Sequence, residues 1–549
     1  MAGAVTTRRT AAELLELVLD DGSFRGWDGP LVDVPAGPRY AADLARARER
    51  TGMDEAVITG EGRLRGRRVA VVACEFGFLA GSIGVAAAER LVAAVERATF
   101  EGLPLLAAPS SGGTRMQEGT VAFLQMAKIA AAVALHKASG LPYLVYLRNP
   151  TTGGVLASWG SLGHVTVAEP GAMIGFLGPR VFEALYDRSF PPGIQAAENL
   201  YRHGIVDAVQ PPEALAEIAD RALGVLMTPR SGLAATGDRE LVQEPLPDVP
   251  AWESVTVSRR ADRPGVRRLL RTAATHVVPL NGTGAGESDP GLLLALAKFG
   301  SAPCVLLGQD RRGQTDTAPM GPAALREARR GMRLAEELGL PLVTVIDTPG
   351  AALSQAAEEG GMAGEIARCL AELVVLEAPT VSLLLGQGTG GGALALVPAD
   401  RVVAALHAWL SPLPPEGASA IVYRDVEHAA EMAAAQGVRS ADLLATGIVD
   451  RVVLERPDAA HEPDEFCRRV GRALEHELLR VLGVDPAERL AGRLGRYRTL
   501  GLTGGSAAGE QRRASLPLGR DSGEYPSGRR IAVGAHEAGQ AASAGRPTR

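Results

Sequence analysis

The order of apolar and polar residues predicts alternating helices and strands along most of the chain. Apolar positions within residues 14–19 fall on one side of a helix that Thr10 can cap and Gly22 can end. The run VAVVAC at 69–74 is continuous and rich in valine, as in a strand buried on both faces. After it the pattern predicts a helix, a strand, a helix and a strand, at 86–98, 104–108, 120–139 and 143–147. This alternation is typical of an α/β fold.

Two segments break the alternation. Residues 229–250 are rich in proline and glycine and show little apolar periodicity, which indicates a linker. The alternation resumes near residues 302–307, and the last segment of the chain is rich in Gly, Ser, Ala and Arg without an apolar pattern, which indicates disorder. We therefore expect an N-terminal domain, a linker, a C-terminal domain and a disordered tail, over residues 1–228, 229–250, 251–503 and 504–549.

The two predicted domains repeat one another. Pro104 and Pro142 each open a strand in the first domain, and Pro341 and Pro379 do so in the second, with equal spacing (142 − 104 = 379 − 341 = 38). In both domains a turn ends the first of these strands at the same offset from its proline (112 − 104 = 349 − 341 = 8). The agreement predicts a tandem of two copies of one α/β unit.

A glycine pair ends the second strand of each domain. Gly153 and Gly154 follow Pro142, and Gly391 and Gly392 follow Pro379 at nearly the same offset (153 − 142 = 11; 391 − 379 = 12). Small residues suited to a closely packed helix come after each pair.

Such turns are suited to binding an oxyanion. Glycine lets the backbone approach a ligand closely, and the N–H groups at the start of a helix are unpaired and partly positive. Two donors aimed at one point form an oxyanion hole, in which each donor contributes about 2.7–4 kcal/mol. Close packing alone explains many single glycine pairs. The matched positions in a repeat favour catalysis, with Gly153, Gly154, Gly391 and Gly392 as the candidates.

Composition and charge exclude several classes of protein. The net charge of −6 argues against a nucleic-acid-binding protein. Cys74, Cys304, Cys369 and Cys467 lie far apart in sequence, which excludes a zinc ribbon and predicts buried thiols in a reducing compartment. The sequence has no signal-peptide core, and the apolar run at 129–135 is far shorter than the roughly 18 residues of a membrane span. We therefore expect a cytoplasmic protein without a membrane partner.

The common motifs of side-chain catalysis are missing. The sequence contains no HExxH, GxSxG or GxxxxGK[ST]. The glycines at 386–391 superficially resemble a dinucleotide-binding loop, but the acidic partner that this loop needs is weak, Asp400 being the candidate. The histidines do not cluster, and His136 and His407 are expected to be solvated or structural. We therefore expect chemistry that relies on backbone dipoles.

Several motifs resemble the carboxyltransferase of bacterial acetyl-CoA carboxylase, with its beta and alpha subunits fused in one chain. SSGGTRMQE, TGGV, IGFLGPR and PPG are similar to the beta subunit, at 110–118, 152–155, 174–180 and 191–193. IDTPGA, GGGALA and PEGAS are similar to the alpha subunit, at 346–351, 390–395 and 415–419. The similarity extends from about residue 10 to about residue 501.

The resemblance implies tandem crotonase-like domains of the ClpP/crotonase superfamily. It implies transfer of a carboxyl group from carboxybiotin to acetyl-CoA, which gives malonyl-CoA for fatty acid synthesis. Gly153 and Gly154 would hold the thioester oxygen of the acyl-CoA, and Gly391 and Gly392 the ureido oxygen of biotin. The biotin nitrogen would act as the base. Phe78, Gly81, Ser82 and Gly84 lie where the family lines its CoA site. The other residues expected to bind these molecules are Gly112, Gly113, Gly350 and Ala351.

The resemblance further implies partner proteins and at least a homodimer. Carboxybiotin would come from a separate biotin carboxyl carrier protein that biotin carboxylase loads, because this chain has no biotinylation motif. Its nearest match, Met126-Ala127-Lys128, has the wrong order and lies on a predicted helix. The chain departs from the family at two points. It has no four-cysteine zinc ribbon, so neither zinc nor a nucleic-acid role is expected, and Gln387 stands where an acidic residue is common.

Three alternatives remain open. The substrate could be propionyl-CoA or another acyl-CoA. The chain could be a beta/gamma fusion of a malonyl-thioester decarboxylase, which shares the tandem fold. It could also be a non-catalytic scaffold, although intact glycine pairs in both halves argue against that role.

Overall fold

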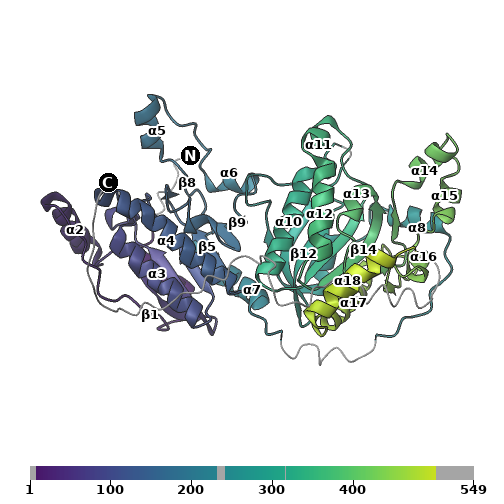
Figure 1. Ribbon diagram of the computed structural model, residues 1–549, viewed down its shortest axis with the longest axis horizontal. Helices are drawn as coiled ribbons and strands as arrows, with labels where there is room; N and C mark the ends of the chain where they lie inside the picture. The colour runs from purple at the N-terminus through teal and green to yellow at the C-terminus, as the bar shows by residue number, and fades with distance from the viewer. Residues whose placement is uncertain (1–7, 231–240, 316, 502–549) are drawn as a thin grey trace, which may run out of the picture. The chain divides into compact units, whose positions relative to one another are not determined.

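Two sheets of matching topology form the framework of this computed structural model, which describes residues 8–230, 241–315 and 317–501 (Figure 1). The order in the first sheet is β1-β2-β3-β4-β5-β7-β9, and in the second β10-β11-β12-β13-β14-β15-β17, with β16 paired to β14. In each sheet two antiparallel pairings lead into parallel strands: β1–β2 and β2–β3 in the first sheet, and β10–β11 and β11–β12 in the second. The predicted repeat is therefore present in the strand order.

The strands of the first half are β1 (Arg25–Gly26), β2 (Val57–Leu64), β3 (Arg67–Cys74), β4 (Leu105–Ala108), β5 (Tyr143–Leu147), β7 (Val165–Ala168) and β9 (Ala208–Val209), with β6 (Thr151–Thr152) and β8 (Ile174–Gly175) as a separate pair. Those of the second half are β10 (Ala274–Leu280), β11 (Leu292–Phe299), β12 (Ala302–Gln309), β13 (Leu342–Thr348), β14 (Thr380–Thr389), β15 (Arg401–Ala405), β16 (Trp409–Ser411) and β17 (Arg451–Val453). All residues of β5, β12 and β13 are buried, as expected for parallel strands that are covered on both faces.

Helices cover the sheets in the same way in both halves. The helices of the first half are α1 (Ala11–Val18), α2 (Pro38–Thr51), α3 (Val85–Phe100), α4 (Gly119–Ala138), α5 (Pro179–Tyr186), α6 (Ala197–Arg202) and α7 (Leu215–Leu226). The second half contains α8 (Ala251–Ser258), α9 (Val266–Ala273), α10 (Pro322–Glu337), α11 (Gln355–Glu359), α12 (Met362–Val375), α13 (Gly390–Leu394), α14 (Pro415–Val422), α15 (Ala429–Ala435), α16 (Ser440–Ala445), α17 (Pro463–Leu482) and α18 (Pro486–Thr499). The pair α3 and α4 packs on the first sheet, and α10 and α12 occupy the equivalent place on the second (Figure 1).

The sequence located most of these elements. Thr10 caps α1 through a capping box, although the helix ends at Val18, before Gly22. The predicted helices and strands at 69–147 all form. The helix expected after Gly153 and Gly154 does not form: the chain continues as turns into a 3-10 helix at Trp159–Ser161. In these turns the Ser158 hydroxyl donates to the Gly154 carbonyl at 2.6 Å.

The domain bounds at 228 and 251 stay a prediction. The chain up to Leu500 forms one compact unit, and the expected tail at 504–549 and residues 231–240 of the expected linker lie outside the described residues. Residues 241–250 contain no helix or strand. There the Gln243 side chain bonds both backbone groups of Val452, on β17, at 3.1 Å.

One helix is longer and more apolar than the sequence analysis anticipated. The segment Met116–Ala138 has the length and hydropathy of a membrane span, and 33% of its most apolar stretch is buried inside the protein. Core helices of soluble proteins can have the same length and hydropathy. In this structure α4 packs against α3 and buries Met126, Ile129 and Val133 in the core of the first half.

Candidate functional site

The first glycine turn follows β6. Gly153 has a left-handed φ of +64°, and its N–H donates to the carbonyls of Gly175, at 3.2 Å, and Phe176, at 3.0 Å. The N–H of Gly153 is therefore used inside the fold, and this residue supplies the turn. Within residues 8–230 the N–H of the next residue, Gly154, has no hydrogen-bond partner.

The loop at residues 110–114, here called the first glycine loop, contacts this turn backbone to backbone. Gly113 has φ +108°, and a Cβ added to it would lie 3.3 Å from the Cα of Gly153 and from the N of Gly154. A Cβ on Gly153 would lie 3.3 Å from the Cα of Gly113 and 3.4 Å from the carbonyl oxygen of Gly112. The N–H of Thr114, which follows this loop, also has no partner among the residues that the structure describes. The structure thus brings the predicted residues 112–113 and 153–154 together.

The second half builds the same turn, one residue earlier than the sequence match suggested. Gly390 has φ +67° and begins α13. The residue before it, Thr389, pairs with Ser411 of β16, just as Thr152, before Gly153, pairs with Gly175 of β8. Gly390 and Gly391 are therefore the counterparts of Gly153 and Gly154, and the offset from Pro379 becomes equal to that in the first half (390 − 379 = 153 − 142 = 11). The predicted correspondence of Gly391 and Gly392 to Gly153 and Gly154 was wrong by one residue, because the sequence does not show which of three successive glycines makes the turn.

A loop also faces the second turn, as in the first half. The N–H of Gly350, which has φ +135°, donates to the Thr348 hydroxyl at 3.1 Å. The N–H of Gly113 donates to the Ser111 hydroxyl at 3.0 Å in the equivalent way. A Cβ on Gly392 would lie 3.4 Å from the backbone N of Ala351 and 2.7 Å from the Cε of Met320.

The predicted CoA-binding residues lie in the loop before α3. The hydroxyl of Ser111 donates to the Gly81 carbonyl at 2.6 Å, so this loop contacts the first glycine loop. Gly84 is the N-terminal cap of α3, and Ser82 is partly buried. The Phe78 side chain is fully buried with Ala47 and Ala56, so its ring supports the loop from inside.

Gln309 is a residue of the second site that the sequence analysis missed. Its side chain donates to the Gly392 carbonyl at 2.7 Å and accepts the N–H of Asp347 at 3.1 Å. The carboxamide therefore ties the first turn of α13 to β13. The available signal was a glutamine at the end of the apolar strand APCVLLGQ.

A buried carboxyl lies next to this glutamine. Asp347 is 1% exposed, and burial raises the pKa of its carboxyl, although Arg311 and Arg263 lower it in part. One of its oxygens accepts the N–H of Gln387 at 3.2 Å. Gln387, which departs from the family motif, thus contributes its backbone to the second site.

The cysteines and two of the histidines lie inside the fold. All four cysteines are free and buried, as predicted, and burial raises the pKa of the Cys74 thiol to about 11. His136 is buried, and burial lowers its pKa to about 4, while His407 donates or accepts a bond at 3.3 Å with Ser254. Within the described residues no group of three or more His, Cys, Asp or Glu could hold a metal ion.

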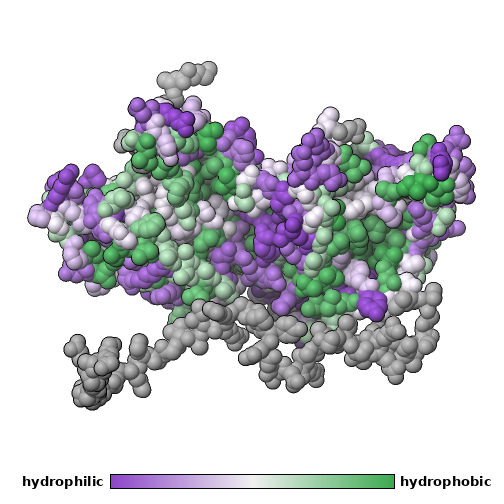
Figure 2. Space-filling model, turned by 45° about the horizontal axis from the view of Figure 1, so that its top comes forward, coloured by the Kyte–Doolittle hydropathy of each residue, from purple (hydrophilic) through white to green (hydrophobic). Residues whose placement is uncertain are grey.

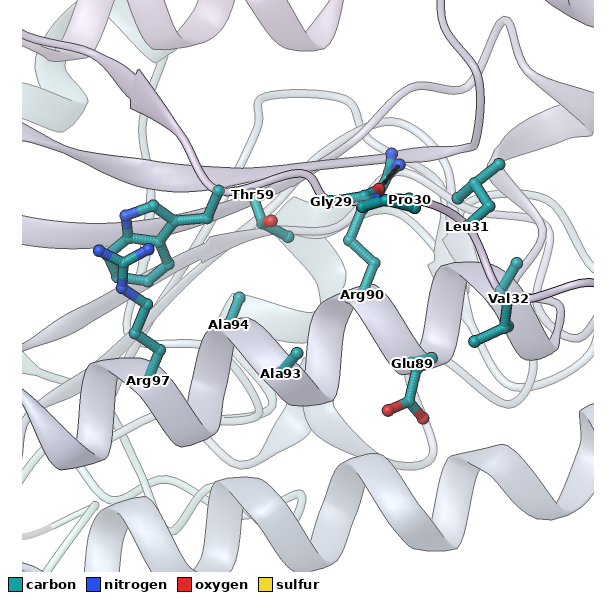
Figure 3. A pocket seen from close by; sticks show the side chains of 12 residues that line it. Gly29, Pro30, Leu31, Val32, Thr59, Glu89, Arg90, Ala93, Ala94 and Arg97 are labelled. Atoms are coloured by element: carbon teal, nitrogen blue, oxygen red, sulfur yellow. Dashed lines mark hydrogen bonds between the residues drawn. The ribbon is translucent and has the colours of Figure 1, made fainter.

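A cavity of about 220 Å³ lies away from the glycine turns, between residues 27–32 and α3 (Figure 3). The Arg90 guanidinium in it is 2.7 Å from Asp54 and 3.5 Å from Asp28, so its charge is balanced inside the fold. The Arg97 guanidinium lies 4.4 Å above the Trp27 ring. None of the glycines at the two turns lines this cavity.

Comparison with protein families and sequences shows which family the chain belongs to. The carboxyl transferase domain family matches residues 5–484. A protein of Mycobacterium tuberculosis named as a probable biotin-dependent acyl-coenzyme A carboxylase beta3 subunit is 64% identical over 496 residues, 90% of this chain and 99% of the relative. A protein of Salinispora tropica named as acetyl-coenzyme A carboxylase carboxyl transferase subunits beta/alpha is 38% identical over 530 residues, 92% of this chain and 93% of the relative.

Solved structures share the fold. The transcarboxylase 12S structure with methylmalonyl-coenzyme A has a TM-score of 0.65 at 21% identity and covers 85% of this chain and 89% of its own. A single-chain, multi-domain long-chain acyl-CoA carboxylase has a TM-score of 0.64 at 21% identity and covers 85% of this chain and 46% of its own. These similarities support the tandem crotonase-like α/β fold that the sequence predicted. The chain belongs to the carboxyl transferase domain family and is a biotin-dependent acyl-CoA carboxyltransferase.

Proposed function

We propose that this chain transfers the carboxyl group of carboxybiotin to acetyl-CoA, giving malonyl-CoA for fatty acid synthesis. The carboxybiotin is carried by a separate biotin carboxyl carrier protein and made by biotin carboxylase. The observation that supports this function best is the pair of equivalent glycine turns, Gly153–Gly154 and Gly390–Gly391, one in each half. Two substrates that each develop negative charge on a carbonyl oxygen need two such sites.

Each turn has a role in this proposal. The thioester oxygen of the acyl-CoA becomes negative as the α-proton leaves, and the unpaired N–H groups of Gly154 and Thr114 are the donors that stabilise it. The ureido oxygen of biotin becomes negative as carbon dioxide leaves, and the N–H groups of Gly391 and Gly392, in the first turn of α13, stabilise that charge. Holding both reactants side by side supplies the rest of the acceleration.

The proposal includes a homodimer in the cytoplasm, in which the first half of one chain faces the second half of its partner. Apolar side chains are exposed in both halves, and apolar regions interrupt the polar surface in Figure 2. In the first half these side chains lie on and near α4, and in the second half they lie on and just after α14 and next to the Thr348–Ala351 loop. They are Met116, Val121, Phe123, Leu124, Leu353, Ile421, Val422 and Val426. Covering apolar surface contributes about 25 cal/mol per Å².

The chain itself is expected to carry no biotin. Lys128 lies within the helix α4 and not at the tip of a turn, and its ammonium pairs with the Glu89 carboxylate. Intact-mass spectrometry of the chain, purified from cells that also express biotin ligase, should give the unmodified mass. A biotin adduct on Lys128, or on any other lysine, would contradict the requirement for a separate carrier.

A substrate panel tests the choice of acetyl-CoA. The full chain, mixed with a biotin carboxylase, a biotinylated carrier, ATP and bicarbonate, should carboxylate acetyl-CoA with a higher kcat/KM than propionyl-CoA or longer acyl-CoA thioesters. A preference for propionyl-CoA or a long chain would correct the substrate. Decarboxylation of malonyl thioesters on an acyl carrier, without transfer to acyl-CoA, would favour the decarboxylase instead.

A further inference from the structure

A strained turn lies beside the first glycine loop. Leu79, Ala80 and Gly81 have successive φ angles of +45°, +58° and +63°. The left-handed region is costly for residues with a Cβ, and such a conformation persists only where the surrounding structure holds it. Two of these three residues have a Cβ, so the turn depends on its contacts.

This turn fixes the loop that faces Gly154. The Ala80 carbonyl accepts the N–H of Gly112 at 2.9 Å, and the Gly81 carbonyl accepts the Ser111 hydroxyl at 2.6 Å. The two segments are also in tight contact, because a Cβ on Gly81 would lie 2.0 Å from the Ser110 carbonyl oxygen. A shift of the turn would therefore move the glycine loop and the backbone donor that follows it.

Arg115 connects the far end of the glycine loop to Ser82 and Ile83, the two residues that follow this turn. Its Nη2 donates to the Ser82 carbonyl at 2.7 Å, and its backbone N–H donates to the Ile83 carbonyl at 2.9 Å. The guanidinium also pairs with the Glu55 carboxylate, with Nη1 and Oε2 at 2.8 Å, and both side chains are buried. A planar guanidinium makes these bonds in a fixed geometry that a lysine cannot reproduce.

Glu118 extends the network to two helices. Its Oε2 accepts the N–H of Val85, the first residue of α3, at 2.6 Å, and its Oε1 accepts the hydroxyl of Tyr40 on α2. Burial and this hydrogen bond raise the pKa of Tyr40 to about 12, so the hydroxyl stays a donor at neutral pH. The carboxylate fits only because residue 84 is glycine, where a Cβ would lie 2.2 Å from Oε1.

We propose that Arg115 and Glu118 are positioning residues of the acyl-CoA half of the site, and that they hold the strained Leu79–Gly81 turn against the glycine loop. This inference rests on the proposed role of the first glycine turn. Arg115 bonds the backbone of Ser82, and Glu118 bonds the backbone of Val85 and the hydroxyl of Tyr40, so both side chains act by holding these segments in place.

Replacing Glu118 by alanine tests the inference. The substitution leaves the N–H of Val85 and the hydroxyl of Tyr40 without their acceptor. In the full chain, with malonyl-CoA and biocytin as substrates, we expect kcat/KM for malonyl-CoA to fall at least tenfold, while KM for biocytin stays within twofold of wild type. Glu118→Gln keeps an acceptor and should recover activity to within threefold. Glu96→Ala, at an exposed position of α3, should match wild type.

A milder variant keeps the test independent of folding. Tyr40→Phe removes one hydroxyl and should lower kcat/KM for malonyl-CoA two- to fivefold. If circular dichroism shows that Glu118→Ala is unfolded, the result for Tyr40→Phe decides whether this network positions the acyl-CoA half of the site. Wild-type values in the folded variants, or equal losses for malonyl-CoA and biocytin, would overturn the inference and leave the proposed function intact. A wild-type chain that transfers no carboxyl group would overturn both.

Discussion

Replacing Gly154 by valine should lower the kcat/KM of carboxyl transfer from malonyl-CoA by about 100- to 1,000-fold, the usual effect of losing one oxyanion donor. The φ of Gly154 is ordinary, so the backbone tolerates a side chain. The loss comes from crowding, because a Cβ would lie 2.9 Å from the Thr114 Oγ1 and 3.1 Å from the Met126 Cγ. The turn must shift, and the N–H of Gly154 then no longer points at the thioester oxygen.

Steady-state kinetics with malonyl-CoA and biocytin measures this effect, and KM for biocytin should stay within twofold of wild type. The matched control is Gly492→Val on α18, where a Cβ has no atom within 4 Å. Full activity of a folded Gly154→Val protein would show that this turn binds no oxyanion.

The equivalent change in the second half, Gly391→Val, should cost a similar factor but act on the other substrate. A Cβ on Gly391 would lie 2.7 Å from the Ile366 Cδ1, so the start of α13 must move. We expect kcat/KM for biocytin to fall by about 100-fold or more, while KM for malonyl-CoA changes little. If both variants showed the same kinetic defect, the assignment of one turn to each substrate would be wrong.

Mixing these two inactive variants also tests the proposed dimer. If each site combines the first half of one chain with the second half of its partner, a mixed dimer contains one site with two intact turns. Subunit exchange between Gly154→Val and Gly391→Val should therefore restore activity to about a quarter of wild type, since half of the dimers are mixed and each has one active site of two. Sites formed within one chain would give no recovery.

The sequence was sufficient for the framework because the strands that carry the site are continuous apolar runs. β3, β5 and β12 were predicted at nearly their observed bounds, and the proline spacing revealed the repeat. The match between the two turns was off by one residue, because the sequence does not show which of three successive glycines takes the left-handed conformation. The role of Gly391 and Gly392 in catalysis stays a prediction.

The contacts that support the first turn could not be predicted. Arg115 reaches Glu55 and Tyr40, which lie 60 and 75 residues away along the chain, and this pairing depends on how α2 packs after folding. The strained φ angles at 79–81 also leave no trace in the sequence, since leucine and alanine do not favour that conformation. Long-range packing, which local pattern does not encode, determines both features.

Biocytin-dependent turnover of malonyl-CoA by the purified full chain tests the central claim most directly, because it requires both turns and no partner protein. The account predicts that malonyl-CoA is converted to acetyl-CoA at a rate that rises with biocytin and saturates. It also predicts that this rate is lost in Gly154→Val and in Gly391→Val. Absence of biocytin-dependent turnover with malonyl-CoA, methylmalonyl-CoA and longer 2-carboxyacyl-CoA thioesters would contradict the proposal that the two turns serve two substrates.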